Sequence, residues 1–579
     1  MTLPKDVAFV TAALTAALTL AGAATAQEPQ TGGVLRILAT GEPDHMDPTS
    51  AGMVNTNNYM RAVSRQLVNY ASSNDAEVAL TPVGDLATEV PQPSEDGLSY
   101  TFTLRQGAMW DAPSGPRQIT STDVERGIKR MCNPVLGSPM QTYFTSLIAG
   151  MSAFCEGFAS VDAEAAAIKA YIEGNDIPGI TQPDDATVTF HLKERAGDFI
   201  YMLSLVNASP EPIEALDHMP DGPDYRANYI SSGPYTVGEY VPDTVIRLVR
   251  NPAWNAESDP IRSAYVDEIE ITMGLQADAI MQQLQSGDAD LAYDINIPTA
   301  ILAMLQATGD DRLMPISAGN TNFLFINTVS DNNGGALKDL RVRQALAYAV
   351  DKAAIVQQWG GPAVAEPVGG IFGLGVLGHH DFDLYPSPDS KGDPDKARAL
   401  LAEAGFPDGI TLKMPYRNKD LEVATAQTLQ ASLARAGITV ELIPVTAADY
   451  YSKFMTNQAN TRDGVWDIAP VGWTPDWVGG AARSVFQPQF TFDGTHQTYN
   501  YTDYNNDEAN RIAAEAINAT TPEETARLWA QVDELVMTDV PVVPLIANKN
   551  PRYHGAAVRN YQVFALGVEG DWTNIWIER

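Results

Sequence analysis

After its first thirty residues, the chain lacks a long apolar run. The stretch GGIFGLGVLG at 369–378 is apolar, but it is short and rich in glycine. A membrane-spanning helix needs about 20 consecutive apolar residues, so we interpret 369–378 as a loop. With 45% apolar and 19% charged residues, the composition is that of a folded globular protein rather than a disordered one.

The sequence also lacks the short motifs of common extracellular hydrolases. It contains no G-x-S-x-G, no H-E-x-x-H and no phosphate-binding G-x-x-x-x-G-K-[ST]. GMSAF, which begins at Gly150, matches only the first three positions of G-x-S-x-G. With 72 acidic residues, the sequence does not exclude a catalytic pair of carboxylates, but no pattern singles one out. We therefore expect no enzyme activity and keep a secreted hydrolase as the alternative from another class.

Basic residues are scarce, with 37 Lys and Arg against 72 Asp and Glu, a formal net charge of −35. So acidic a surface repels nucleic acid and anionic membranes, and we expect neither as a partner. The charge does not by itself indicate a cationic ligand, because carboxylates spread along a whole chain also serve solubility.

Histidine is rare, and only one group stands out among the seven, HHDFD at 379–383. Neighbouring His and Asp supply the nitrogen and oxygen donors that metals bind. Adjacent residues of an extended loop point to opposite sides, however, and no partner pair with ligand spacing accompanies them. We expect a solvated loop, with metal binding as the minor alternative, and no cofactor.

The apolar segment at the N-terminus predicts export. Residues 7–20 contain only Ala, Val, Leu, Thr and Phe, and ATAQ at 24–27 offers an A-x-A cleavage site. This pattern predicts a secretory signal peptide over 1–26, with a short buried helix as the alternative. No cysteine follows LAGA at 20–23, so we expect no lipid anchor there. The mature protein should be free in the periplasm or outside the cell.

Cysteine is limited to Cys132 and Cys155. Because an exported protein folds in an oxidising compartment, we expect a disulfide bond between them. Such a bond would stabilise the fold by roughly 3 kcal/mol in the chain-entropy picture. Two buried free thiols are the alternative.

Length and pattern predict an α/β protein with at least two cores. A chain of 579 residues is too long for a single hydrophobic core. Short β-rich runs alternate with helical patterns throughout. Strands are expected within 32–39, 98–107, 186–194 and 266–273. Helices are expected after the cap residue Asp393 and after a capping box from Thr521 to Glu524.

A loop in the last quarter of the chain combines turn residues with two tryptophans. It reads APVGWTPDWVGG at 469–480, and Pro475 and Asp476 give it good turn chemistry after a strand-like run. One interpretation is a strand and turn whose tryptophans belong to the core. The other is a binding wall, in which indole rings cover a ligand and Asp476 pairs with an ammonium group. The residues alone favour neither.

Nine segments, in order, resemble one family. They are GGVLRI…MDPT (32–49), SEDGLSYTFTLRQGAMW (94–110), SSGPYTVGEYVPDTVIRLVRNPAW (231–254), VDEIEI…LQSGDADLAYDI (266–295), LRVRQALAYAVDKAAIV (340–356), DPDKARALLAEAGF (393–406), GITVEL (437–442), WDIAPVGWTPDW (466–477) and DVPVVPLI (539–546). On these segments the chain resembles the extracytoplasmic solute-binding proteins of family 5, the peptide/nickel class, which are the substrate-binding components of ABC importers.

The resemblance implies a two-lobed α/β fold of the type II periplasmic-binding-protein kind, with a hinge and an extra subdomain in the first lobe. The expected bounds are 27–58 and 186–318 for lobe I, 59–185 for the subdomain, 319–540 for lobe II and 541–579 for a return to lobe I. Hinge crossings are expected near 317–323 and 540–545. Binding would close the lobes on a ligand without covalent chemistry.

The resemblance also implies a ligand site around the tryptophan loop. In peptide-binding members, this loop presents main-chain groups to an extended peptide, and an aspartate takes its α-ammonium. Carried over, Gly472 and Thr474 would offer main-chain groups, and Trp473 would line a side-chain pocket. Asp476 would bind the ammonium.

Other parts of the implied site are less well matched. Gly52 and Met53 would approach a peptide from the first lobe. Arg417 is the candidate for binding the ligand carboxylate. The resemblance, however, places Met414 at the position where peptide-binding relatives bind that carboxylate. VGGAARSVF at 478–486 stands where dipeptide-binding relatives often continue with an acidic residue and proline. This departure leaves the recognition of the ligand's C-terminus open.

The implied partners are a short peptide and the permease and ATPase subunits of an importer, with the protein itself a monomer. Within the same importer role, an oligosaccharide, an opine or a nickel chelate remains an alternative ligand.

Overall fold

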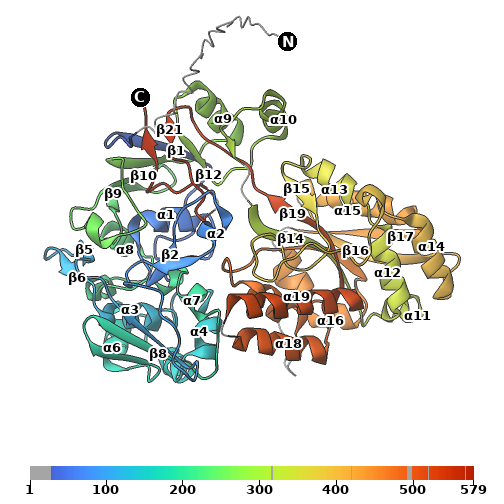
Figure 1. Cartoon of the computed structure of the whole chain (residues 1–579), viewed down its shortest axis with the longest axis horizontal. Helices are drawn as coiled ribbons and strands as arrows, with labels where there is room; N and C mark the ends of the chain where they lie inside the picture. The colour runs from blue at the N-terminus through green and yellow to red at the C-terminus, as the bar shows by residue number, and fades with distance from the viewer. Residues whose placement is uncertain are drawn as a thin grey trace, which may run out of the picture.

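The computed structural model describes residues 28–579 apart from 315–316, 419, 447–448, 492–498, 520 and 568. The expected signal peptide over 1–26 therefore lies outside the described residues. Figure 1 shows two halves side by side, one formed by the blue to green part of the chain together with the red C-terminal end, and one by the yellow to red part before that end. Within the described residues, no helix is long and apolar enough to span a membrane.

The first lobe is built on a five-stranded mixed sheet in the order β12-β1-β11-β10-β9. Its strands are β1 (Val34–Ala39), β9 (Tyr235–Val241), β10 (Val245–Arg250), β11 (Glu268–Thr272) and β12 (Leu291–Tyr293). β1 runs parallel to β11 and β12, whereas β10 is antiparallel to both of its neighbours. The carboxyl ends of β1 and β12 thus lie at the same edge of the sheet. In sheets of this kind, the loops at that edge bind ligands.

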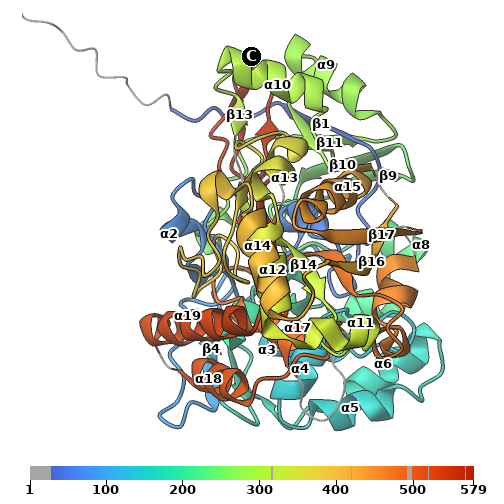
Figure 2. The ribbon, with the colours of Figure 1, turned by 90° about the vertical axis from the view of Figure 1, so that its right-hand side faces the viewer.

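Helices complete the first lobe. α1 (Thr56–Val63) packs against β9 and contributes Tyr59 and Met60 to the core of this lobe. Figure 2 shows α9 (Ala277–Ser286) and α10 (Thr299–Thr308) at the end of the molecule opposite α18 (Asp507–Asn518) and α19 (Pro522–Asp539).

A subdomain with its own sheet extends from the first lobe. β4 (Ser99–Thr103), β8 (Thr187–His191) and β7 (Ile180–Asp184) form an antiparallel sheet in the order β4-β8-β7. Its helices are α3 (Ser121–Arg130), α4 (Gln141–Leu147), α5 (Met151–Phe158) and α6 (Ala165–Gly174). Cys132, just after α3, and Cys155 in α5 form a disulfide bond, with their Cα atoms 5.2 Å apart. The bond fastens α5 to the end of α3.

The second lobe contains a four-stranded antiparallel sheet in the order β15-β19-β14-β18. Its strands are β14 (Ser317–Ile326), β15 (Ala365–Pro367), β18 (Ile468–Trp473) and β19 (Val542–Lys549), and β16 (Ile410–Arg417) pairs in parallel with β17 (Ile438–Val445) beside it. Four helices share the core of these strands: α12 (Leu340–Ala349), α13 (Lys352–Trp359), α14 (Pro394–Glu403) and α15 (Asp420–Ala434).

The two helix starts predicted from cap residues are confirmed. The Asp393 side chain accepts a hydrogen bond from the Lys396 main chain at the start of α14. The Thr521 hydroxyl accepts one from the Glu524 main chain at the start of α19. These caps satisfy main-chain donors that have no partner inside the helix. Helices and sheets follow one another as the α/β prediction requires.

Two neighbouring segments connect the lobes. On the first-lobe side, β13 (Leu313–Met314) pairs with β20 (Arg552–Tyr553). On the second-lobe side, Ser317 of β14 pairs with Lys549 of β19. The chain therefore crosses from the first lobe to the second after Met314 and returns after Lys549. Residues 542–545, which we expected in the hinge, lie inside β19 instead, because this strand completes the second-lobe sheet.

Three expected domain boundaries fall inside structural units. The boundary between 58 and 59 divides α1, and the one between 185 and 186 divides the β7–β8 hairpin. The one between 318 and 319 divides β14. The fourth, between 540 and 541, lies before β19, which belongs to the second lobe. We propose 67–216 for the subdomain, most of whose buried apolar residues lie in one core together with residues of the second lobe, and 550–579 for the return segment.

Candidate functional site

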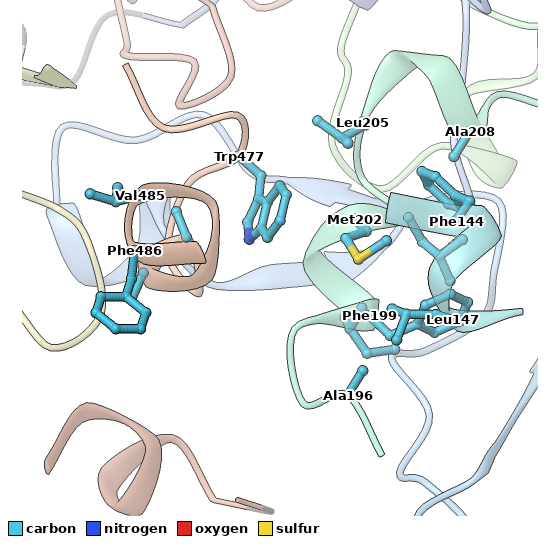
Figure 3. Close-up of a cluster of buried hydrophobic side chains, with 14 of the residues drawn as sticks. Phe144, Leu147, Ala196, Phe199, Met202, Leu205, Ala208, Trp477, Val485 and Phe486 are labelled. Carbon is cyan, nitrogen blue, oxygen red and sulfur yellow. The ribbon is translucent and has the colours of Figure 1, made fainter. Parts of the chain in front are cut away.

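The tryptophan loop lies where the second lobe meets the subdomain. Trp477 is only 1% exposed, and Figure 3 shows it between Val485 and Phe486 of α17 (Ala482–Phe490) and the helix that carries Met202. Its ring meets Tyr143 of α4 edge to face, with centroids 4.9 Å apart. For Trp477 the core interpretation of the loop is therefore correct, and this core is shared by both lobes.

Asp476 faces the subdomain. Its Oδ2 accepts a hydrogen bond from the hydroxyl of Tyr143, and its main-chain N donates to Ser484 Oγ at 3.1 Å. Burial raises the pKa of Asp476 to about 6, and the hydrogen bond from Tyr143 offsets part of that rise. No described Lys or Arg pairs with this carboxylate. The result is a desolvated anion without a protein cation, at the junction of the lobes.

The side chains of Trp473 and Thr474 are held by the protein itself. Trp473 is half-buried, donates from Nε1 to the Ser484 carbonyl at 3.1 Å and meets the Tyr499 ring with centroids 5.2 Å apart. The Thr474 hydroxyl accepts a hydrogen bond of 2.7 Å from Asn320 Nδ2. The loop that carries Asp476 is thus fixed on both sides before any ligand is present.

A cavity of about 260 Å³ lies at the end of β18, and it brings Gly472 and Arg417 together. Successive residues of a strand face opposite sides of its sheet, so Gly472 faces away from Trp473. The polar side chains that line the cavity include Asn320, Asn322, Asn548, Arg417, Glu422 and Tyr451. Arg417 Nη1 lies 3.2 Å from Glu422 Oε1, and its guanidinium stands over the Tyr451 ring at 5.5 Å.

The space above Gly472 is occupied by a side chain of the neighbouring strand. Gly472 pairs with Asn322 across β14 and β18, and a Cβ at 472 would lie 3.0 Å from Asn322 Oδ1. A side chain at 472 would therefore push the Asn322 amide aside by a few tenths of an ångström. Met414, which the alignment placed at the carboxylate-binding position, is fully buried in the second-lobe core, whereas Arg417 reaches the cavity.

Gly52 and Met53 lie in the first lobe, on the loop between β1 and α1. Their main-chain N–H groups both donate to Asp44 Oδ2, at 2.8 and 2.9 Å. These donors, which we expected to meet a peptide, already have a protein acceptor. The side chain of Met53 is 58% exposed, so this loop offers a ligand an apolar side chain rather than free N–H groups.

The two histidines of the HHDFD segment contact other residues of the protein. His380 Nε2 lies 2.9 Å from Glu534 Oε1, and His379 Nδ1 lies 2.8 Å from the Phe372 carbonyl. Across the part of the chain that the structure describes, no group of three or more His, Cys, Asp or Glu is arranged to hold a metal ion.

Polar contacts join the lobes beside the tryptophan loop. Arg483 of α17 and Asp198 next to α7 (Phe199–Met202) form a buried ion pair with N and O 3.3 Å apart. The Tyr70 hydroxyl donates to the Val478 carbonyl at 3.1 Å, and Gly197 N donates to the Ile517 carbonyl at 3.0 Å. On this side the lobes are in direct contact.

Sequence reasoning missed Tyr143, which is the group closest to the predicted ammonium anchor. It lies 333 residues before Asp476, within a helix that carries no motif. Asn322 and Asn548 were missed for the same reason, because two strands far apart in the sequence bring them together.

Comparison with known proteins identifies the family. Residues 81–481 match the family described as bacterial extracellular solute-binding proteins, family 5 Middle. Heme-binding protein A of Haemophilus influenzae is 25% identical over 510 residues, 83% of this chain and 82% of that protein. The periplasmic oligopeptide-binding protein OppA of the same organism is 24% identical over 544 residues, 90% of this chain and 89% of that protein.

Solved structures agree with the fold. Clavulanic acid biosynthesis oligopeptide binding protein 2 superposes with a TM-score of 0.82 at 27% identity, covering 95% of this chain and 96% of that chain. HbpA2 of Haemophilus parasuis superposes with a TM-score of 0.75 at 20% identity, covering 94% and 100%. The predicted two-lobed α/β fold of the type II periplasmic-binding-protein kind is thus confirmed. The chain belongs to the bacterial extracellular solute-binding proteins of family 5.

Proposed function

We propose that the protein captures short peptides between its lobes and delivers them to the permease and ATPase subunits of an ABC importer. It would act after export, free in the periplasm or outside the cell, as a monomer and without covalent chemistry. The names of two similar proteins, an oligopeptide-binding protein OppA and an oligopeptide binding protein 2, support a peptide ligand over an oligosaccharide, an opine or a nickel chelate.

The observation that carries the proposal is the Asp476 carboxylate at the lobe junction. A half-buried carboxylate without a cationic partner attracts a ligand ammonium, because the ammonium restores the charge balance lost on burial. Tyr143, on the opposite lobe, would then touch the same group. A ligand bound there contacts both lobes, so its binding energy favours their approach.

The edge of the second-lobe sheet suits an extended peptide. β18 is the outermost strand in the order β15-β19-β14-β18, and the loop from Gly472 to Asp476 continues from its end. Gly472 N donates a long hydrogen bond of 3.4 Å to the Tyr451 hydroxyl, so this donor is weakly held and could pair with a peptide carbonyl. Main-chain pairing of this kind gives affinity without selecting side chains.

The two crossings provide the hinge for closure. The first follows Met314 and the second follows Lys549, and the strands on either side of them, β13 with β20 and β14 with β19, pair antiparallel. Changes of φ and ψ at a few such residues rotate whole lobes. A peptide that binds the closed form more tightly than the open form shifts the population towards the closed form, which a permease would recognise.

Thermal unfolding of the purified protein tests the proposal. A ligand at 100 times its Kd raises the free energy of unfolding by about 2.7 kcal/mol. We expect tri- and tetrapeptides with free amino termini to raise Tm and cello-oligosaccharides to leave it unchanged. Stabilisation by oligosaccharides alone would overturn the peptide assignment.

A further inference from the structure

The cavity beside Gly472 lies within reach of a peptide held at Asp476. Asp476 lies four positions after Gly472, and four residues of extended chain span at most about 14 Å. An extended peptide covers that length with about four residues of its own. Provided that the proposed function holds, the cavity therefore faces a side chain at position 2, 3 or 4 of a peptide whose ammonium is bound by Asp476.

The charged groups of the cavity cancel each other. Arg417 and Glu422 form an ion pair of 3.2 Å, and their side chains are 26% and 31% exposed. A ligand carboxylate in the cavity would meet Arg417, whose charge is already balanced by Glu422. A ligand ammonium would meet Glu422, whose charge is already balanced by Arg417. Either charge would lose hydration without gaining an opposite charge that is not already paired, and Arg417 Nε, which has no hydrogen-bond partner among the described residues, is itself buried. The cavity therefore disfavours both acidic and basic side chains.

The amides of the cavity present one acceptor and one donor. Asn322 Nδ2 donates to Asn548 Oδ1 at 3.0 Å. This bond leaves Asn322 Oδ1 and Asn548 Nδ2 without a hydrogen-bond partner among the described residues. Both side chains line the same cavity and are partly exposed. An apolar ligand group there would displace water from these atoms and leave them unsatisfied, which is unfavourable.

A carboxamide satisfies both atoms at once, because it carries a carbonyl acceptor and an NH₂ donor on one carbon. Its NH₂ can donate to Asn322 Oδ1 while its oxygen accepts from Asn548 Nδ2. It brings no charge, so the Arg417–Glu422 pair is left intact. We propose that this cavity selects peptides with a glutamine or asparagine side chain at one of positions 2 to 4.

Binding calorimetry on the purified protein with a set of tetrapeptides tests this selection. Gln, Glu, Met and Lys replace Ala at positions 2, 3 and 4 of Ala-Ala-Ala-Ala, one position at a time. Gln, Glu and Met have similar size but differ in charge and hydrogen bonding. We expect Gln to bind about tenfold or more tightly than the other three at one position, since two hydrogen bonds distinguish it. Equal affinities at every position would overturn the proposal.

Two variants link the preference to the cavity. Asn548→Leu removes the free donor, and Asn548→Asp keeps the size but replaces the donor by an acceptor. Both should reduce the Gln preference to within about twofold of Met. The control Asn175→Leu, at an exposed position after α6, should preserve the preference. A Gln preference that survives both Asn548 variants would show that another part of the cleft reads the side chain, and would overturn the proposal.

The proposed function fails separately from this inference. If Ala-Ala-Ala-Ala and all of its derivatives fail to bind, peptide capture itself is wrong. If they bind with equal affinity, peptide capture stands and only the selection by the cavity is wrong. An unliganded Tm within a few degrees of the natural protein shows that each variant is folded.

Discussion

The hydroxyl of Tyr143 in the subdomain donates a hydrogen bond to the carboxylate of Asp476 in the second lobe. The two residues belong to different lobes, which are also joined by the Tyr70–Val478 and Gly197–Ile517 hydrogen bonds and by the two hinge crossings. A ligand ammonium that binds Asp476 must either join Tyr143 at the carboxylate or displace it. The pair thus couples ligand binding to the contact between the lobes.

The pH dependence of peptide binding should follow the ionisation of Asp476. Its pKa is raised to about 6 by burial, so below pH 6 the unliganded protein holds a neutral acid that attracts an ammonium weakly. We expect affinity to fall about tenfold per pH unit below pH 6 and to level off towards pH 7, where the peptide amine is still charged. Calorimetry between pH 4.5 and 7 measures this profile.

Asp476→Asn is the necessary control, because burial also raises the pKa of Asp533 and Glu569 to about 7. The variant should bind weakly and with little change between pH 5 and 7. An equally steep profile in the variant would assign the pH dependence to another group.

Tyr143→Phe should move the midpoint of that profile upwards. The hydrogen bond from Tyr143 lowers the pKa of Asp476, so its loss leaves burial unopposed and the carboxyl holds its proton to higher pH. The matched control is Tyr171→Phe, since Tyr171 also donates a hydrogen bond within the subdomain, to the Phe154 carbonyl at 2.9 Å, but away from the lobe junction. A midpoint that stays in place or falls in Tyr143→Phe would contradict the contact.

Gly472→Ala should weaken peptide binding and lower stability. The new methyl would lie 3.0 Å from Asn322 Oδ1, so the amide must shift by a few tenths of an ångström or the strands must separate. Overpacking of this kind costs about 1–3 kcal/mol, measurable by urea unfolding. Gly41→Ala is the control, because its Cβ would meet nothing within 4 Å. Unchanged stability and affinity in Gly472→Ala would mean that Asn322 does not need its present position.

Removal of the disulfide should destabilise the subdomain without changing the ligand site. Cys132 and Cys155 are separated by 23 positions, and closing a loop of that length contributes about 3 kcal/mol in the chain-entropy picture. The double variant with Ser at both positions should lose about that much free energy of unfolding and keep its peptide affinity. Two thiols labelled by alkylation of the unreduced natural protein would show that the bond does not form.

The sequence predicted those parts of the fold that depend on local pattern. Alternating strands, the caps at Asp393 and Thr521 and the α/β class depend on neighbouring residues and on periodicity. Boundaries were less accurate, since residues 540–545 were expected in the hinge, whereas residues 542–549 form a strand. Only pairing with β14, more than 200 residues earlier, determines that they form β19.

The candidate site shows the same limit. Asp476 and Gly472 could be chosen because turn chemistry and family resemblance mark their loop. Tyr143, Asn322 and Asn548 carry no local signal, since each acts through a partner from a distant segment. Gly52 and Met53 were predicted to contact a peptide because of their place in the chain. The sequence does not reveal that Asp44 accepts hydrogen bonds from their main-chain N–H groups.

The most direct test of the central claim compares one tetrapeptide with a free amino terminus and the same peptide N-acetylated, each against the natural protein and Asp476→Asn at pH 7. Asp381→Asn, at a fully exposed acid, is the control. If Asp476 binds the ammonium, acetylation should weaken binding to the natural protein and to the control by about 1.5–3 kcal/mol, the contribution of a hydrogen bond to a charged group. Asp476→Asn should bind both peptides about equally. Equal affinity of the natural protein for the free and the acetylated peptide would contradict the assignment.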